Sequence, residues 1–230
     1  MFQNFDFDVI RRSLPYLFLD GMTFTLTLTG LATLGGVIFG TLLAMMRLGG
    51  LLILPRIAAA YVNLMRSLPL VLVIFWFYFL VPYLGQWVTG AERPVAVGAF
   101  ASSLITFTLF EAAYFSEIMR AGIQSIPRGQ VAAGYALGLT YPQVMGYIVL
   151  PQAFRNMVPV LLTQTIILFQ DTSLVYVLSI TDFLGAASKI AQRDGRLVEM
   201  YLFAAAVYFA ISYAASLVVK RLQARTAIVR

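Results

Sequence analysis

The sequence predicts an all-α membrane protein with five transmembrane helices, arranged as one domain over residues 1–230. Of these residues, 60% are hydrophobic and only 11% are charged, whereas soluble domains carry about 25% charged and about 45–50% apolar residues. The mean hydropathy is +0.85. Five apolar stretches are long enough to cross a bilayer, since a spanning helix needs about 20 such residues. A chain this apolar is expected to face lipid.

The five stretches follow one another without a Gly/Ser-rich or Pro-rich linker, which favours a single domain. The spans are expected at residues 21–46, 67–84 (with an alternative start at Ala58), 95–119, 157–180 and 200–219. Ahead of the first span, Asp6 and Asp8 interrupt the chain before any apolar run. This argues against a cleavable signal peptide and favours a segment lying on the bilayer surface. Within the first span, Gly36 and Gly40 form a small-residue pattern suited to close helix packing, which could serve a subunit interface.

The chain contains no cysteine and no histidine. This excludes disulfides, iron–sulfur clusters, zinc sites built on Cys or His, and Ser-His-Asp or Cys-His catalysis. A phosphate-binding G-x-x-x-x-G-K-[ST] loop is missing from the sequence too. We therefore expect no enzyme activity, no metal site and no bound cofactor.

The net charge of +6 reflects membrane topology better than nucleic-acid binding. Basic residues gather in three stretches, 47–57, 120–156 and 220–230, which contain no Asp or Glu. Cytoplasmic loops of membrane proteins are enriched in Lys and Arg. The sequence therefore predicts an N-terminus outside the cell and a C-terminus in the cytoplasm.

The single long cytoplasmic connection, about residues 121–156, reads as two short helices rather than a linker. Pro127 suits a first helical turn, and Gly138 offers a left-handed stop. Thr140 and Gln143 have the spacing of a capping box that opens a second helix, which Pro151 is expected to limit. Its small and apolar residues favour burial against a partner.

At this loop the sequence resembles the coupling motif of bacterial ABC importer permeases, E-A-A, three residues, G, nine residues, I-x-L-P. Nine residues separate Gly138 from Ile148-Val149-Leu150-Pro151, as in the motif, whereas Ala132 stands in place of the Glu and Gly134 in place of the second Ala. The resemblance implies the five-helix permease fold with a cytoplasmic coupling helix. The ATPase-coupling residues would be Gly129, Gln130, Ala132, Ala133, Gly134, Gly138, Ile148, Leu150 and Pro151.

Three further segments are similar to the polar amino-acid branch of this family, especially to glutamate/aspartate permeases. They are Arg66–Leu70, Tyr114–Ile123 and Gln170–Leu174. The resemblance implies the bacterial inner membrane, two cytoplasmic ATPases that use ATP and Mg²⁺, a second permease (the same chain or a sister), a periplasmic binding protein and no nucleic acid. Alternatives are a permease for another polar amino acid, an ion-coupled secondary transporter using Glu111 and Asp171, and a scaffold subunit without a substrate site.

Polar residues in or near the apolar spans are the substrate-pathway candidates, because ionisable groups inside a bilayer cost about 2.5–3.5 kcal/mol each. These candidates are Arg66, Glu111, Glu117, Gln164, Asp171, Thr172 and Ser173. Asp171 shares a helix face with Gln164, seven residues earlier. It could receive the ammonium of a substrate, or form an interhelical clamp or cap at a helix break, and Thr172 and Ser173 follow it in either role.

The other charged candidates also have two interpretations. Glu111 could coordinate an amino group or pair with Arg66 across helices. Glu117 and Arg120 are three residues apart, which favours a local ion pair. Arg66 could hold a carboxylate through its planar guanidinium if its helix begins at Ala58, or reach the headgroups if the helix begins at Ser67.

Overall fold

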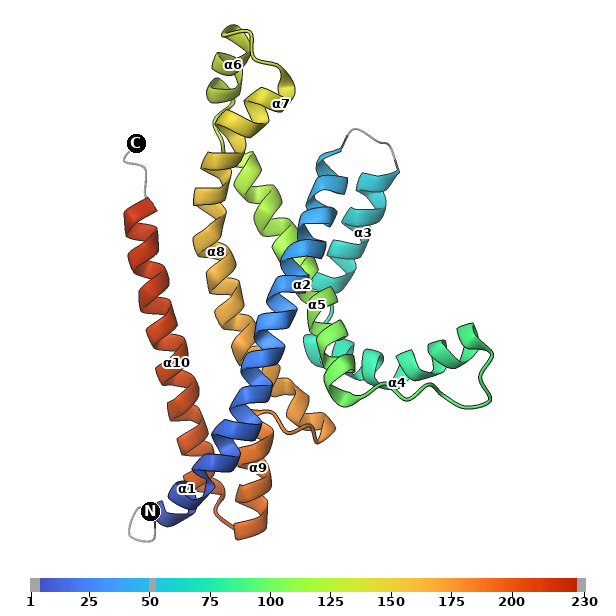
Figure 1. The fold of residues 1–230 in the computed structure, drawn as a ribbon, viewed down its shortest axis with the longest axis vertical. Coiled ribbons are helices and arrows are strands. Elements are labelled where there is room, and N and C mark those ends of the chain that lie inside the picture. Colours follow the sequence, from blue (N-terminus) through green and yellow to red (C-terminus); the bar gives the residue numbers. More distant parts are fainter. Residues whose placement is uncertain (1–4, 50–52, 227–230) are drawn as a thin grey trace.

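The computed structural model describes residues 5–49 and 53–226, and these residues form helices joined by short loops, without a β-strand (Figure 1). Five helical stretches are long and apolar enough to cross a membrane, as the sequence predicts: Phe7–Leu48, Leu70–Thr89, Ala99–Gln124, Tyr141–Leu178 and Leu197–Ala224. The all-α prediction is thus confirmed for the described residues. Each span is longer than expected because flanking helical turns continue it.

The first span is built from three consecutive segments. These are α1 (Phe7–Pro15), the π-helical η1 (Tyr16–Met22) and α2 (Thr23–Leu48). The N-terminal segment expected on the bilayer surface is therefore helical from Phe7 and continuous with the span. Asp6 caps α1 by accepting hydrogen bonds from the backbone N–H groups of Asp8 and Val9 at 2.9 and 3.3 Å.

The centre of the fold is the packing of α2 against α5 (Ala99–Gln124). A Cβ atom at Gly36 would lie 2.9 Å from the Phe115 ring, and one at Gly40 would lie 3.0 Å from the carbonyl oxygen of Ala112. The backbones can approach this closely only because both residues are glycine. The close helix packing expected at this pattern is thus present, but the partner of the glycines is α5 of the same chain rather than a second subunit.

The second span differs most from expectation. The chain forms α3 (Leu54–Ser67), breaks at Leu68 and Pro69, and resumes as α4 (Leu70–Thr89). Leu68 is extended, with φ −102° and ψ 140°, the conformation that a following proline favours. Neither expected start, Ala58 or Ser67, is therefore correct. Figure 1 shows α3 beside α2, whereas α4 lies across the direction of α2 and α5.

The long connection contains α6 (Arg128–Ala136) and α7 (Tyr141–Val144), as predicted. Pro151 does not limit the second helix, because η2 (Met145–Val149), a π-helical turn, carries α7 into α8 (Leu150–Asp171). A proline lacks an N–H group and clashes with the preceding turn of a regular α-helix. The wider π-turn before Pro151 accommodates it. From Thr172 the chain tightens into the 3₁₀ helix η3 (Thr172–Leu178).

Helices α9 (Phe183–Asp194) and α10 (Leu197–Thr226) complete the fold. In Figure 1, α9 lies at the same end as α1, and α6 and α7 lie at the opposite end, toward which α10 runs. The buried Asp182 caps α9 by accepting hydrogen bonds from the N–H groups of Leu184 and Gly185 at 3.0 and 2.9 Å. Burial raises the pKa of this carboxyl to about 6.

Candidate functional site

The midpoint of α5 carries a fully buried carboxylate, Glu111, twelve residues after the first residue of the helix and thus about 18 Å along it. Gln164 on α8 donates through Nε2 to both carboxylate oxygens of Glu111, at 3.3 and 3.2 Å. The expected pair of Glu111 with Arg66 is wrong. A long polar partner on the neighbouring helix satisfies this carboxylate instead.

Tyr114 lies one helical turn beyond Glu111 on α5 and contacts a charged side chain of another helix. The guanidinium carbon of Arg66 lies 5.5 Å from the centre of the Tyr114 ring, within the range of a cation–π contact. The sequence places Tyr114 in a matching segment but does not single it out. Its i, i+3 spacing from Glu111 is the signal that could have done so.

Asp171 ends α8 and is half-buried. Of its two predicted roles, the cap at a helix break finds no support, because its side chain makes no capping hydrogen bond to η3. The next residue, Thr172, is fully buried and donates to the carbonyl oxygen of Phe169 at 2.7 Å, so its hydroxyl is committed to its own helix. Ser173 is half-buried. Asp171 thus keeps acceptor capacity that no other described residue fills by a hydrogen bond or an ion pair.

We name the group Arg66, Glu111, Tyr114, Gln164 and Asp171 the central polar group. It combines one cation with two carboxylates, contributed by α3, α5 and α8. The Arg66 side chain is 42% exposed, and among the described residues no side chain or carbonyl accepts a hydrogen bond from it. A zwitterionic ligand needs a cation for its carboxylate and an anion for its ammonium, and this group offers both.

Glu117 lies further along α5 and is surrounded by arginines from three helices. Its Oε1 atom accepts from Arg47 Nη1 of α2 at 2.7 Å, and its Oε2 atom accepts from Arg120 Nη2 and Nε at 2.7 and 3.1 Å. Arg66 Nη1 lies 3.5 Å from Oε1. The predicted Glu117–Arg120 pair is confirmed. The contributions of Arg47 and Arg66 were not predicted, because helices distant in sequence supply them.

The coupling loop has its own small core. Gly134 is buried, and a Cβ atom there would lie 2.7 Å from Ile148 Cδ1 and 3.0 Å from Val144 Cγ2. The replacement of the motif's second Ala by Gly134 thus lets α6 sit closely on η2. Gly138 has a φ of +77° with open space around its Cα atom, which confirms the predicted left-handed stop. The other expected coupling residues lie at the surface or half-buried: Gly129, Gln130, Ala132, Ala133, Ile148, Leu150 and Pro151.

Large side chains that the sequence did not single out dominate the surface of this loop. Tyr135, Leu137, Tyr141 and Tyr147 are 47%, 80%, 63% and 76% exposed. At this end of the fold the loop extends beyond the neighbouring ends of α2 and α5 (Figure 1). Exposed apolar groups gathered in one loop are typical of a protein–protein interface.

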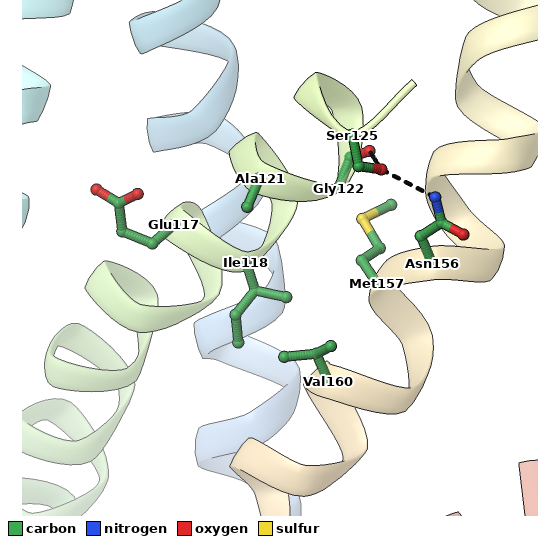
Figure 2. Close-up of a pocket in the computed structure, with 8 residues that line it drawn as sticks. All are labelled: Glu117, Ile118, Ala121, Gly122, Ser125, Asn156, Met157 and Val160. Atoms are coloured by element: carbon green, nitrogen blue, oxygen red, sulfur yellow. Dashed lines mark hydrogen bonds between the residues drawn. The ribbon is translucent and has the colours of Figure 1, made fainter. Parts of the chain in front are cut away.

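A cavity of about 380 Å³ lies between α5 and α8, near the base of the coupling loop (Figure 2). Ile118, Met157 and Val160 give it apolar walls, and Asn156 Nδ2 donates to Ser125 Oγ at 2.9 Å at one end. At the other end the Glu117 carboxylate points away from the remaining labelled side chains in Figure 2. Glu117 thus lines this cavity, whereas no member of the central polar group does.

Residues 21–228 match the family described as "Binding-protein-dependent transport system inner membrane component", and the chain belongs to this family. It is thus a membrane-embedded permease subunit of an ABC importer and not an enzyme. The chain is 56% identical to the glutamate/aspartate import permease protein GltK of Escherichia coli O6:H1 over 97% of its length and 99% of that protein. It is 34% identical to the probable glutamine ABC transporter permease protein GlnP of Bacillus subtilis, over 90% of this chain and 92% of that one.

Solved structures agree with this assignment. A crystal structure of an amino acid ABC transporter with histidines aligns with a TM-score of 0.86 and 30% identity, over 96% of this chain and 98% of that chain. The MetNI methionine ABC transporter in an inward-facing conformation aligns with a TM-score of 0.71 over 94% of this chain and 98% of that chain. At 20% identity, the second likeness concerns the fold alone.

Proposed function

We propose that this chain is the permease subunit of an ATP-driven importer of glutamate and aspartate. The observation that carries the proposal is the 56% identity to a glutamate/aspartate import permease, which extends over nearly the whole of both chains. A periplasmic binding protein delivers the substrate, a second permease completes the pathway, and two cytoplasmic ATPases supply the energy. No nucleic acid takes part.

The central polar group is the substrate site in this proposal. Arg66 holds a substrate carboxylate through its planar guanidinium, which suits bidentate binding. Asp171 receives the ammonium, since its carboxylate is the unfilled one, while Gln164 holds Glu111 in place. Tyr114 supports Arg66 through the contact between its ring and the guanidinium. Thr172 and Ser173 follow Asp171 in sequence, and the buried Thr172 supports the backbone rather than the ligand.

The coupling loop is the docking surface for the ATPase. Its exposed Tyr135, Leu137, Tyr141 and Tyr147 are buried by the partner, while the core around Gly134 keeps α6, α7 and η2 moving as one body. Closure of the ATPases on ATP is then transmitted through η2 into α8, which carries Gln164 and Asp171. This assignment places the coupling loop and the C-terminus in the cytoplasm and the N-terminus outside. The acid-free basic stretches support that orientation.

Substrate identity is tested by isolating the intact complex and determining which amino acid its binding protein retains. Glutamate or aspartate is expected, and competition by the same acids should abolish uptake of the labelled substrate into proteoliposomes. Retention of a neutral or basic amino acid alone would overturn the choice of substrate and leave the family unaffected.

The scaffold alternative is tested by replacing Arg66 and Asp171 separately with Ala. Both variants should assemble with their partners but lose most uptake, because each removes one half of the charge pair that holds a zwitterion. Glu92, an exposed carboxylate between α4 and α5, gives the matched control Glu92→Ala. If both site variants transport normally, this chain contributes scaffold alone.

A further inference from the structure

Glu117 is the single carboxylate among three arginines, Arg47, Arg66 and Arg120, and we call these four residues the arginine cluster. Each carboxylate oxygen already accepts a hydrogen bond at 2.7 Å, one from Arg47 and one from Arg120. Arg66 approaches only to 3.5 Å. Glu117 therefore accepts three hydrogen bonds from two arginines and holds the third arginine by charge alone.

The arginine cluster carries a net charge of two positive units, since an arginine stays protonated at all ordinary pH values. It is partly open to water, with Arg120 31% and Arg66 42% exposed. Arg66 belongs both to this cluster and to the central polar group. A carboxylate bound at Arg66 thus has two further guanidinium groups next to it, on the side of the coupling loop.

Three closely spaced arginines would bind an acidic amino acid tightly, because guanidinium–carboxylate pairs are strong and bidentate. A transporter must release its substrate, so tight capture between the central site and the cytoplasm would slow the cycle. Glu117 counters this capture. It accepts hydrogen bonds from one N–H group of Arg47 and two of Arg120, offsets one of the three positive charges, and repels an incoming carboxylate.

We propose that Glu117 is a release residue, which keeps the arginine cluster from capturing the carboxylate of a substrate leaving Arg66. The inference rests on the proposed function, since only an anionic substrate is affected. Glu117 acts through the arginines and does not bind the substrate, which makes it a positioning residue. Without Glu117, the arginine cluster would bind the departing carboxylate and slow its release.

The test uses proteoliposomes that contain the complete transporter. It measures uptake of labelled substrate and the inhibition of this uptake by unlabelled glutamate added on the ATPase side. The Glu117→Gln variant should lower the half-inhibiting concentration of glutamate at least about tenfold, because it removes the negative charge that repels the departing carboxylate. Glutamine, which lacks the side-chain charge, should show a smaller shift. Glu117→Asp keeps the charge and should behave like the parent, as should the exposed Glu92→Gln.

A purely structural role predicts a different result. Loss of a helix clamp lowers uptake at every glutamate concentration and leaves the half-inhibiting concentration unchanged, which would overturn the proposal. An equal shift for glutamine and glutamate would overturn it as well. If Glu117→Gln does not assemble, Arg120→Gln decides, because it removes one of the capturing guanidinium groups and leaves the 2.7 Å bond between Glu117 and Arg47 intact. It should raise the half-inhibiting concentration of glutamate, and an unchanged value would overturn the proposal.

The same experiment separates the two proposals. If the parent transporter neither transports glutamate and aspartate nor is inhibited by them, the proposed function itself is contradicted. A parent that transports glutamate, together with a Glu117→Gln variant of unchanged inhibition, contradicts only the release role of Glu117.

Discussion

Replacing Gly138 should uncouple ATP hydrolysis from transport. This residue has a φ of +77°, and no atom lies within 4 Å of the position that its Cβ would occupy. A substitution therefore meets no clash, and its cost is purely conformational. Left-handed backbone costs an L-residue about 1–2 kcal/mol, and a β-branched side chain lies at the upper end, so Gly138→Val should strain the turn between α6 and α7 by about 2 kcal/mol.

Because 1.4 kcal/mol corresponds to a factor of ten in an equilibrium, this strain should shift most molecules to another loop conformation. Gly138→Val should therefore reduce the binding-protein-stimulated ATPase activity of the reconstituted complex about tenfold. Asn tolerates the left-handed region, and Gly138→Asn should stay within about threefold of the parent.

Gly90 provides the matched control, since its φ is +68°, its surroundings are equally open, and it follows α4, far from the coupling loop in the chain. Gly90→Val imposes the same backbone strain elsewhere. If it reduces stimulation as much as Gly138→Val does, or if Gly138→Val is as active as the parent, the reasoning about the coupling loop is refuted.

Three further substitutions test the fold and its surfaces. Gly40→Leu should prevent stable folding, because even a Cβ atom there lies 2.8 Å from Phe115 Cβ and 3.0 Å from the Ala112 carbonyl, whereas Gly30→Leu, with open surroundings, should keep the parent's thermal stability in detergent. Tyr147→Ser should lower the amount of ATPase that copurifies with the permease without lowering the permease's own melting temperature, since Tyr147 is 76% exposed; an unchanged yield would contradict docking at this surface. Because burial raises the pKa of Asp182 to about 6, the folded state binds a proton that the unfolded state releases, and stability should rise by about 1–3 kcal/mol as the pH falls from 7 to about 4.5. Asp182→Asn keeps the cap acceptor and should lose that part of the pH dependence, so parallel pH profiles of melting temperature would refute it.

The sequence correctly predicted the structural features that depend on residues close together in the chain. Hydropathy located the five spans, and Pro127, Gly138 and the Thr140–Gln143 pair located α6 and α7, because a cap, a stop and an apolar run act within a few residues. The charge pattern also identified the Glu117–Arg120 pair, whose partners share one helical turn.

Sequence reasoning failed where helices distant in the chain meet. The residues around Gly36 and Gly40 do not indicate whether these glycines pack against α5 or against another subunit. Glu111 pairs with Gln164 rather than Arg66 because of the way α5 and α8 cross. Arg47 reaches Glu117 from a helix 70 positions away. The helix was expected to end near Pro151 but continues through a π-turn, since a proline can end a helix, redirect it or be absorbed by a wider turn.

The central claim is that this chain carries an acidic amino acid across the membrane on energy from a separate ATPase. The most direct measurement is uptake of labelled aspartate into proteoliposomes that hold the permease alone or together with its ATPase and binding protein. Uptake should require all partners and ATP, and should persist when ionophores collapse the proton and sodium gradients. Uptake by the permease alone, driven by an ion gradient and indifferent to ATP, would contradict the account and favour a secondary transporter.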